Sequence, residues 1–180
     1  MSEHLKRINR ELKFKGTVID FYQDTIEVDG THTVLYDFIK HDGAAAVVPV
    51  RNDGKILMVR QYRNALDRFT IEIPAGKLDS IHESGLIAAA RELEEETGYR
   101  SLKMEWLLTL RTALAYCDER IEVYLARDLE QTKQKLDQDE FVEVLAFTID
   151  ELKELIFSGK IEDTKTISAL LAYESKYLKA

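Results

Sequence analysis

The sequence has a single cysteine, Cys117, and no long apolar run. One thiol cannot close an internal disulfide, so a reducing compartment is expected. No stretch approaches the roughly 18 apolar residues that span a bilayer. The opening residues MSEHLKRINRELKF lack the apolar core of a secretory signal. These absences argue against a disulfide-stapled secreted domain or an integral membrane protein, and they predict a cytoplasmic protein without a membrane partner.

Positive charge is also in short supply, with 25 Lys and Arg against 33 Asp and Glu and a net charge of −8. A chain with this balance lacks the basic surface that long nucleic acid requires, so no nucleic-acid partner is expected. The histidines have no metal-like spacing, which argues against zinc. To bind a small anion, such a protein needs a metal ion or well-placed arginines.

The 180 residues predict one domain over 1–180, and its first two thirds are rich in β-type segments. We expect the N-terminal 1–12 to form a frayed helical arm. Strands are expected over 17–22, 25–28, 33–40, 44–51, 56–63, 102–112, 120–126 and 141–147. The apolar runs 44–50 and 56–59 are typical of central strands that are covered on both faces.

Three segments have helical character: 83–97, 150–157 and a last one from Asp163 or Thr164 to Leu178. Residues 128–140 are polar without periodicity and are expected to form a surface loop. Several strands with one central and two late helices indicate an α+β fold and not an alternating doubly wound sheet.

The chemically richest stretch is 72–99, EIPAGKLDSIHESGLIAAARELEEETGY. Glu92, Glu95 and Glu96 stand at i, i+3 and i+4, so their carboxylates share one helix face and repel one another. Hard oxygen ligands without His or Cys suit Mg²⁺ or Mn²⁺. Since Mg²⁺ usually bridges carboxylates to phosphate, this interpretation predicts a phosphate or diphosphate substrate. A solvated acidic face is the plainer alternative.

The spacing of this stretch resembles the signature box of the Nudix hydrolases. The box positions are filled by Gly76, Glu83, Arg91-Glu92-Leu93, Glu95-Glu96 and Gly98-Tyr99. Six residues separate Gly76 from Glu83, one more than is usual, and loops tolerate such insertions. The resemblance implies a mixed β-sheet sandwiched between helices, with the box forming a loop, a helix and a loop.

The likeness extends to 38–50 (FIKHDGAAAVVPV), 56–63 (ILMVRQYR) and 118–125 (DERIEVYL), which resemble the bacterial ADP-ribose pyrophosphatase branch. This implies Mg²⁺-dependent hydrolysis, with Mn²⁺ as an alternative metal, of a nucleoside diphosphate derivative. In the parent case ADP-ribose gives AMP and ribose 5-phosphate. It also implies a homodimer, in which N-terminal strands at about residues 13–40 help form the partner's nucleoside site.

Carried over residue by residue, the resemblance implies a set of metal ligands and an arginine that orients them. The ligands would be Glu92, Glu95, Glu96 and the backbone carbonyl of Ala75, with Glu95 also counted as catalytic. Arg91 would orient the glutamates. Paired with Glu83, it would also hold the helix against its loop, which makes Glu83 structural.

Outside the box, Glu140 would take the proton of the attacking water, with Asp139 as the next candidate. Arg63 would approach the phosphates of the substrate, unless it is a plain surface arginine. Leu114 stands where the branch has a proline, and Tyr36 stands where it often has an arginine. Tyr36 could stack on a base or ring, although core packing is the more usual role of a strand tyrosine.

These two departures, at positions 36 and 114, leave the choice of substrate open. The sequence therefore keeps two other functions in view. One is hydrolysis of another nucleotide sugar or a dinucleotide by the same fold, and the other is a non-catalytic nucleotide-binding sensor.

Overall fold

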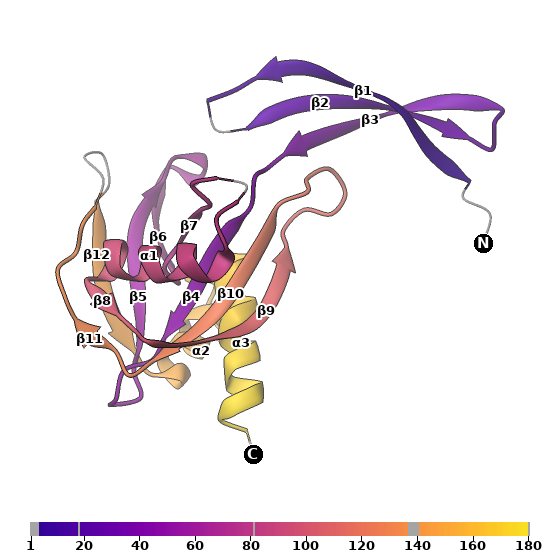
Figure 1. Cartoon of the computed structure of the whole chain (residues 1–180). Helices are drawn as coiled ribbons and strands as arrows, with labels where there is room; N and C mark the ends of the chain where they lie inside the picture. The colour runs from indigo at the N-terminus through magenta and orange to yellow at the C-terminus, as the bar shows by residue number, and fades with distance from the viewer. Residues whose placement is uncertain (1–3, 18, 81, 137–140, 180) are drawn as a thin grey trace. The chain divides into compact units, whose positions relative to one another are not determined.

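The structure is a computed structural model that describes residues 4–17, 19–80, 82–136 and 141–179. The chain divides into two compact units. Unit 1 comprises residues 1–42 and 111–120, and unit 2 comprises residues 43–110 and 121–180. Figure 1 follows the chain through both. None of the helices in the described ranges combines the length and the apolarity needed to cross a bilayer.

Unit 1 is built on a three-stranded antiparallel sheet in the order β1-β2-β3. The strands are β1 (Leu5–Lys15), β2 (Asp20–Val28) and β3 (His32–Lys40). The β2–β3 turn passes through Asp29 and Gly30, which have φ angles of 50° and 67°. Asp and Gly tolerate this left-handed conformation, so the hairpin forms where the Asp-Gly pair predicts it.

The N-terminal arm is a strand, and the expectation of a helix over residues 1–12 was wrong. β1 pairs with β2 with a register shift between Arg7 and Asn9. The shift places Leu5 opposite Val28 and Leu12 opposite Tyr22, on the same face of the sheet. Leu5 and Leu12 are seven residues apart, which is the spacing of two helical turns. The bulge therefore gives a strand a helix-like apolar pattern.

Unit 2 contains a mixed four-stranded sheet, a three-stranded sheet and a two-stranded ladder. The four-stranded sheet has the order β7-β4-β10-β9, in which β4 and β10 are parallel and β4 and β7 are antiparallel. The other orders are β12-β5-β6 and β11-β8. The strands are β4 (Ala44–Pro49), β5 (Ile56–Arg63), β6 (Arg68–Glu72), β7 (Ala75–Lys77), β8 (Tyr99–Arg100), β9 (Lys103–Arg111), β10 (Arg120–Arg127), β11 (Glu130–Gln131) and β12 (Val142–Phe147), with a 3₁₀ turn at Asn64–Leu66.

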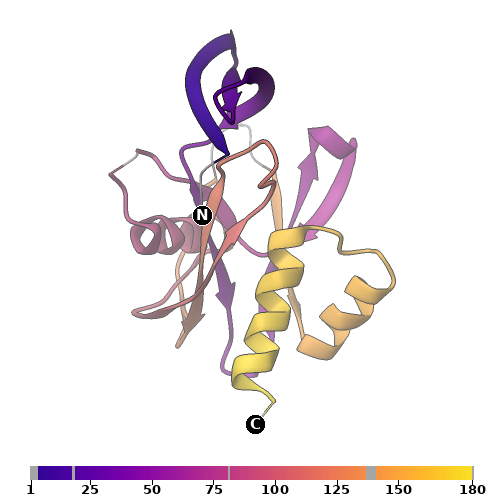
Figure 2. The ribbon, with the colours of Figure 1, turned by 90° about the vertical axis from the view of Figure 1, so that its right-hand side faces the viewer.

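Three helices complete unit 2, and each begins at a polar cap. α1 (Gly85–Thr97), α2 (Ile149–Phe157) and α3 (Thr164–Tyr177) have Ser84, Thr148 and Asp163 as N-caps. These side chains accept hydrogen bonds from backbone N–H groups that have no partner inside the helix. Figure 2 shows α1 on one side of the strands and α2 and α3 on the other.

Strand β4 lies between α1 on one face and α2 and α3 on the other, and its side chains alternate between the two cores. Ala44, Ala46 and Val48 pack in a large cluster with residues of α2 and α3 such as Leu152 and Leu170. Ala45 and Val47 face the other way, where they pack with Ala88, Ala89 and Leu93 of α1. All six residues of β4 are buried. This arrangement confirms the α+β prediction of a mixed sheet between helices and explains the continuous apolar run.

Candidate active site

Helix α1 carries three of the four glutamates of the box, Glu92, Glu95 and Glu96, and is capped at both ends. The hydroxyl of Ser84 accepts a hydrogen bond from the N–H of Ile87, and Gly98 ends the helix with a φ of 70°. Leu93 is fully buried against the sheet, together with the two alanines one turn before it. The apolar face thus anchors the helix and sets the direction of the glutamates. Glu92 and Glu96 are themselves buried, at 9% and 4% exposed.

Arg91 lies among the carboxylates and binds several of them at once. Its Nη1 donates to Glu92 Oε1 at 2.6 Å and to Glu95 Oε2 at 3.1 Å. Its Nε donates to Glu83 Oε1 at 3.3 Å, and its Nη2 donates to the carbonyl of Lys77 at 3.0 Å. One guanidinium therefore ties the helix to the preceding loop. Burial lowers the pKa of Arg91, but its carboxylate partners raise that pKa by a larger amount, so the guanidinium stays charged.

Glu83 closes this loop from the other side. Its Oε2 accepts a hydrogen bond from the N–H of Asp79 at 2.6 Å. That bond and the contact with Arg91 hold the pKa of the Glu83 carboxyl below its usual range. The residue inserted between Gly76 and Glu83 thus leaves a loop that still closes on itself and on the helix.

The strand side of the site approaches α1 very closely. The N–H of Ala75 donates to Glu96 Oε2 at 2.9 Å. A Cβ added to Gly76 would lie 1.9 Å from Glu92 Oε1 and 2.2 Å from its Cδ. The box therefore needs glycine at this position to make room for a carboxylate. We refer to Glu83, Glu92, Glu95 and Glu96 as the glutamate cluster.

The glutamate cluster has the donor chemistry for a hard divalent cation. Four carboxylates, those of Asp79, Glu83, Glu92 and Glu95, lie within 4 Å of the single Arg91 guanidinium and outweigh its charge. Among the described residues, no three His, Cys, Asp or Glu side chains already form a metal-binding group. Arg91 takes up some of the carboxylate oxygens that a cation would use. The excess of negative charge and the all-oxygen donors fit Mg²⁺ or Mn²⁺.

A second charged group in unit 2 centres on Glu72, whose side chain is only 4% exposed. Arg63 donates to it from Nε at 2.8 Å and from Nη2 at 2.7 Å. Lys165 Nζ donates to the same carboxylate and, at 2.9 Å, to Asp163 Oδ2. Burial raises the pKa of Glu72, but Arg63 and Lys165 outweigh it and lower the pKa to about 2. We call Arg63, Glu72, Asp163 and Lys165 the Glu72 ion network.

Arg63, a member of the Glu72 ion network, also responds to the charge of one member of the glutamate cluster. The pKa of Arg63 is raised first by its hydrogen bonds to Glu72 and further by the charges of Glu72, Glu96 and Asp163. Arg63 is therefore no isolated surface arginine. Sequence reasoning missed Glu72 and Lys165 as members of this neighbourhood. The available signal was the acidic residue three positions before Ala75, but its lysine partner lies 93 residues away in sequence.

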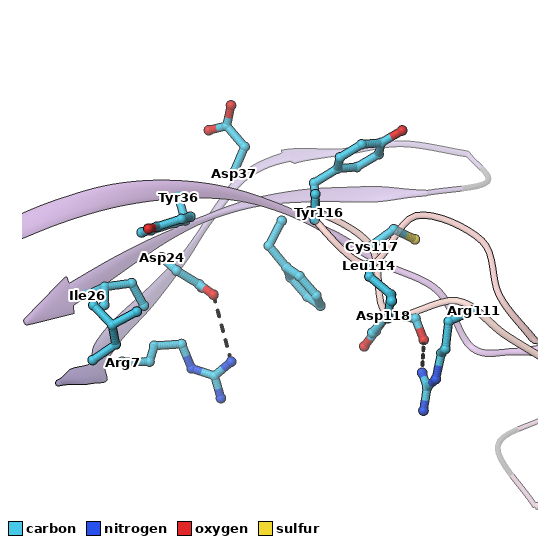
Figure 3. Close-up of a pocket in the computed structure, with 13 residues that line it drawn as sticks. Arg7, Asp24, Ile26, Tyr36, Asp37, Arg111, Leu114, Tyr116, Cys117 and Asp118 are labelled. Atoms are coloured by element: carbon cyan, nitrogen blue, oxygen red, sulfur yellow. Dashed lines mark hydrogen bonds and ion pairs between the residues drawn. The ribbon is translucent and has the colours of Figure 1, made fainter. Parts of the chain in front are cut away.

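Tyr36 and Leu114 lie in unit 1, where both line a cavity of about 480 Å³ (Figure 3). Tyr36 is 48% exposed and Leu114 is 81% exposed, so the core-packing alternative for Tyr36 is not what the structure shows. The cavity is lined by strands β1 to β3 and by residues 111–118. It is mainly apolar and also holds Arg7, which forms an ion pair with Asp24 at 3.8 Å.

The structure thus brings together Ala75, Arg91 and the three α1 glutamates, and the charge of Glu96 contributes to the raised pKa of Arg63. Glu140 and Asp139, the candidates for the general base, lie outside the described residues.

The chain has clear relatives. Residues 40–170 match the family model described as NUDIX domain. The chain is 40% identical over 176 residues to an ADP-ribose pyrophosphatase of Bacillus subtilis (strain 168), covering 97% of this chain and 92% of the relative. It is also 40% identical over 167 residues to a methanol dehydrogenase activator of Bacillus methanolicus, covering 92% and 90%.

Among solved structures, the crystal structure of an ADP compounds hydrolase superposes with a TM-score of 0.86. The match covers 96% of this chain and 94% of that one at 20% identity, so it shows a shared fold. The family model spans both units and includes the whole glutamate cluster. The chain belongs to the Nudix family.

Proposed function

We propose that the protein is a Mg²⁺-dependent hydrolase that cleaves the diphosphate linkage of ADP-ribose to give AMP and ribose 5-phosphate. The observation that carries the proposal is the glutamate cluster, where buried carboxylates outnumber the one guanidinium among them. Such a site is built for a cation and a polyanionic substrate. The ADP-ribose pyrophosphatase relative supports the choice of substrate.

In this proposal Glu92, Glu95 and Glu96, with the carbonyl of Ala75, hold the metal. When bound, Mg²⁺ neutralises phosphate charge and makes water a better nucleophile. The protein supplies the positioning, because Arg91 fixes Glu92 and Glu95, and the N–H of Ala75 fixes Glu96. With these oxygens held in place, little reorganisation is needed when substrate binds.

Arg63 and Glu140 have proposed roles on the substrate side. Nε and Nη2 of Arg63 bind Glu72, and Nη1 has no hydrogen-bond partner within the described part of the chain. Its side chain is 41% exposed, which leaves Nη1 able to bind a phosphate oxygen. Glu140, or Asp139, takes the proton of the attacking water. A carboxylate on a loop can reach the site once substrate is bound.

Unit 1 is proposed to select the nucleoside and to form a homodimer. Tyr36 and Leu114 line an apolar cavity in which a base or sugar ring could stack. The strands of unit 1 also expose Leu5, Ile8, Leu12, Phe14 and Leu35, each 45% to 67% exposed. Apolar side chains gathered on one small sheet are typical of a protein interface. The proposed dimer uses the strands over about residues 13–40, which carry Phe14 and Leu35 of this set, and light scattering at two concentrations tests it.

We further propose that both units form one Nudix domain over residues 1–180, because the family match at 40–170 includes parts of each. The single cysteine agrees with a reducing compartment, and the cytoplasm is the proposed location. No nucleic-acid or membrane partner is proposed.

A second candidate keeps the fold and changes the substrate to another nucleotide sugar or a dinucleotide. It is favoured by Tyr36 and Leu114, which depart from the branch pattern and line the same cavity. The methanol dehydrogenase activator is as similar to this chain, at 40% identity, as the ADP-ribose pyrophosphatase is. Overall similarity therefore does not choose between substrates. The third candidate, a nucleotide sensor without catalysis, is disfavoured because every glutamate of the box is present.

The test is a panel of nucleoside diphosphate derivatives, assayed for hydrolysis with Mg²⁺. Fastest hydrolysis of ADP-ribose supports the proposal, fastest hydrolysis of another compound supports the second candidate, and tight binding without turnover supports the sensor. Glu96→Gln should lower kcat by at least about a hundredfold while the protein stays folded, because it removes a ligand. Near-normal turnover by this variant would refute the metal assignment. For Glu140→Gln, an unchanged pH profile of kcat would remove Glu140 as the base.

A further inference from the structure

Arg63 is held by Glu72, and Glu72 is held in turn by Lys165 from the C-terminal helix α3. Glu72, its bidentate partner, ends β6, and Arg63 ends the neighbouring strand β5. On its other side Glu72 Oε2 accepts a hydrogen bond from Lys165 Nζ, and Oε1 accepts one from Thr70 Oγ1 at 2.6 Å. Both carboxylate oxygens are thus occupied from two directions. The plane of the carboxylate, which sets the plane of the Arg63 guanidinium, is fixed.

Lys165 is itself fixed by the first turn of α3. Its side chain is 10% exposed, and its Nζ also binds Asp163, the N-cap of the helix. Asp163 Oδ2 accepts hydrogen bonds from the N–H and the hydroxyl of Thr166, at 2.9 and 2.6 Å. Thr166 Oγ1 accepts one from the N–H of Ile73 at 3.0 Å. The first turn of α3 therefore binds two consecutive residues of the chain, Glu72 and Ile73.

These contacts of α3 lie close in sequence to residues of the proposed metal and phosphate site. Three residues after Glu72 comes Ala75, whose N–H holds Glu96, and the charge of Glu96 acts on Arg63. Without Lys165, Glu72 would keep Arg63 and Thr70 as partners but would lose the cation that holds Oε2 from the side of α3. Arg63 would then be paired with a carboxylate that is held less firmly, and the direction of its Nη1 would be less well defined.

We propose that Lys165 is a positioning residue, which orients Arg63 toward the substrate's diphosphate by fixing Glu72 between them. The inference deepens the proposed function and rests on it, since it takes Arg63 as a phosphate ligand. Lys165 acts through Glu72 and does not touch the substrate. Its effect should therefore disappear when Arg63 is absent.

The experiment measures the Kd of metal-free ADP-ribose by calorimetry in EDTA. Lys165→Met, which keeps most of the side-chain stem and removes the charge, should weaken binding about tenfold, because a charge-assisted phosphate contact is lost. Arg63→Ala should weaken binding at least as much. The double variant should bind no more weakly than Arg63→Ala alone. Lys165→Arg, which keeps the charge, should retain most of the affinity.

A matched control is Lys160→Met, because Lys160 is exposed and lines a second cavity, in unit 2, that Arg63 and Glu72 also line, without binding Glu72. It should leave the Kd within about twofold, as expected of an exposed charge. Thermal melting of all variants separates positioning from folding, if the Kd is measured about 15 °C below each variant's Tm. Loss of a purely structural lysine would lower Tm but would leave that Kd unchanged.

Additive losses in the double variant would overturn the inference, as would an unchanged Kd for Lys165→Met. Failure of the wild type to bind ADP-ribose would also overturn it, because Arg63 would then hold no phosphate. Turnover with Mg²⁺ is measured separately. A wild type that binds ADP-ribose but hydrolyses none refutes the proposed function and leaves the positioning of Arg63 standing.

Discussion

The buried carboxyl of Glu72 makes a specific prediction for stability at low pH. Its pKa is about 2 in the folded protein, against an ordinary value of 4.5. Since the folded pKa is the lower one, the unfolded chain binds the proton more readily. The stabilisation is therefore fully present above about pH 4.5 and is lost as the pH falls toward 2. The perturbation is acidification, and the reference is Glu72→Gln, which cannot ionise.

The magnitude follows from the two pKa values. Each tenfold difference in proton affinity is worth about 1.4 kcal/mol, so Glu72 contributes on the order of 3 kcal/mol at pH 7. At pH 3 the unfolded carboxyl is almost fully protonated while the folded one remains mostly ionised. Roughly 2 kcal/mol of the contribution is lost by then. Because the side chain is 4% exposed, water screens this interaction little.

The assay is urea unfolding of the wild type and of Glu72→Gln at several values between pH 7 and 3. The difference between the two should be about 3 kcal/mol at pH 7 and should shrink to about 1 kcal/mol at pH 3. Other acids titrate in both proteins and cancel. If the variant does not fold, the carboxyl ¹³C shift of Glu72 reports the same quantity in the wild type. A difference that stays constant with pH, or a titration midpoint near 4.5, would refute the reasoning.

Three further predictions follow from packing and capping. Gly76→Ala places a Cβ against the carboxylate of Glu92 and should lower kcat/KM for ADP-ribose by about a hundredfold, because displacements near 1 Å have this effect at catalytic groups. A Tm within a few degrees of the wild type would show that the loss of activity is local. Thr148→Ala removes the capping box with Glu151 and should lower the unfolding free energy by about 1 kcal/mol with activity unchanged, measured by urea titration. Leu170→Ala should lower the free energy of unfolding by about 2 to 5 kcal/mol, since Leu170 is fully buried in the main core. A decrease of less than about 1 kcal/mol would contradict the packing described.

The parts of the fold that could be predicted from sequence are those encoded over short distances. Gly98 marks the end of α1 and the Asp29-Gly30 pair marks the β2–β3 turn, and both lie where the pattern indicates. The box spacing also predicts that Arg91 lies among the glutamates. In each case the interacting residues are within about two helical turns of one another, so periodicity alone brings them together.

What could not be predicted depends on pairing between distant segments. β1 has the apolar spacing of a helix, and only its bulged pairing with β2 makes it a strand. The partner of Glu72 is equally hidden, because Lys165 reads as an ordinary lysine in the first turn of a helix. A lysine becomes a buried ion-pair partner only through a tertiary contact, and one sequence carries no sign of that contact.

The parallel pairing of β4 with β10 has a consequence for synthesis of the chain. β4 can pair early with β7 at residues 75–77, but its parallel partner lies at residues 121–126. In the same way, β5 can pair early with β6, but its other partner, β12, lies at residues 142–147. Closing loops of this length costs entropy before any contact compensates for it. On the ribosome the buried strand β4 therefore emerges well before β10 exists. We expect nascent chains that end before residue 120 to expose this apolar segment, which makes them targets for chaperones and proteases until β10 has been made.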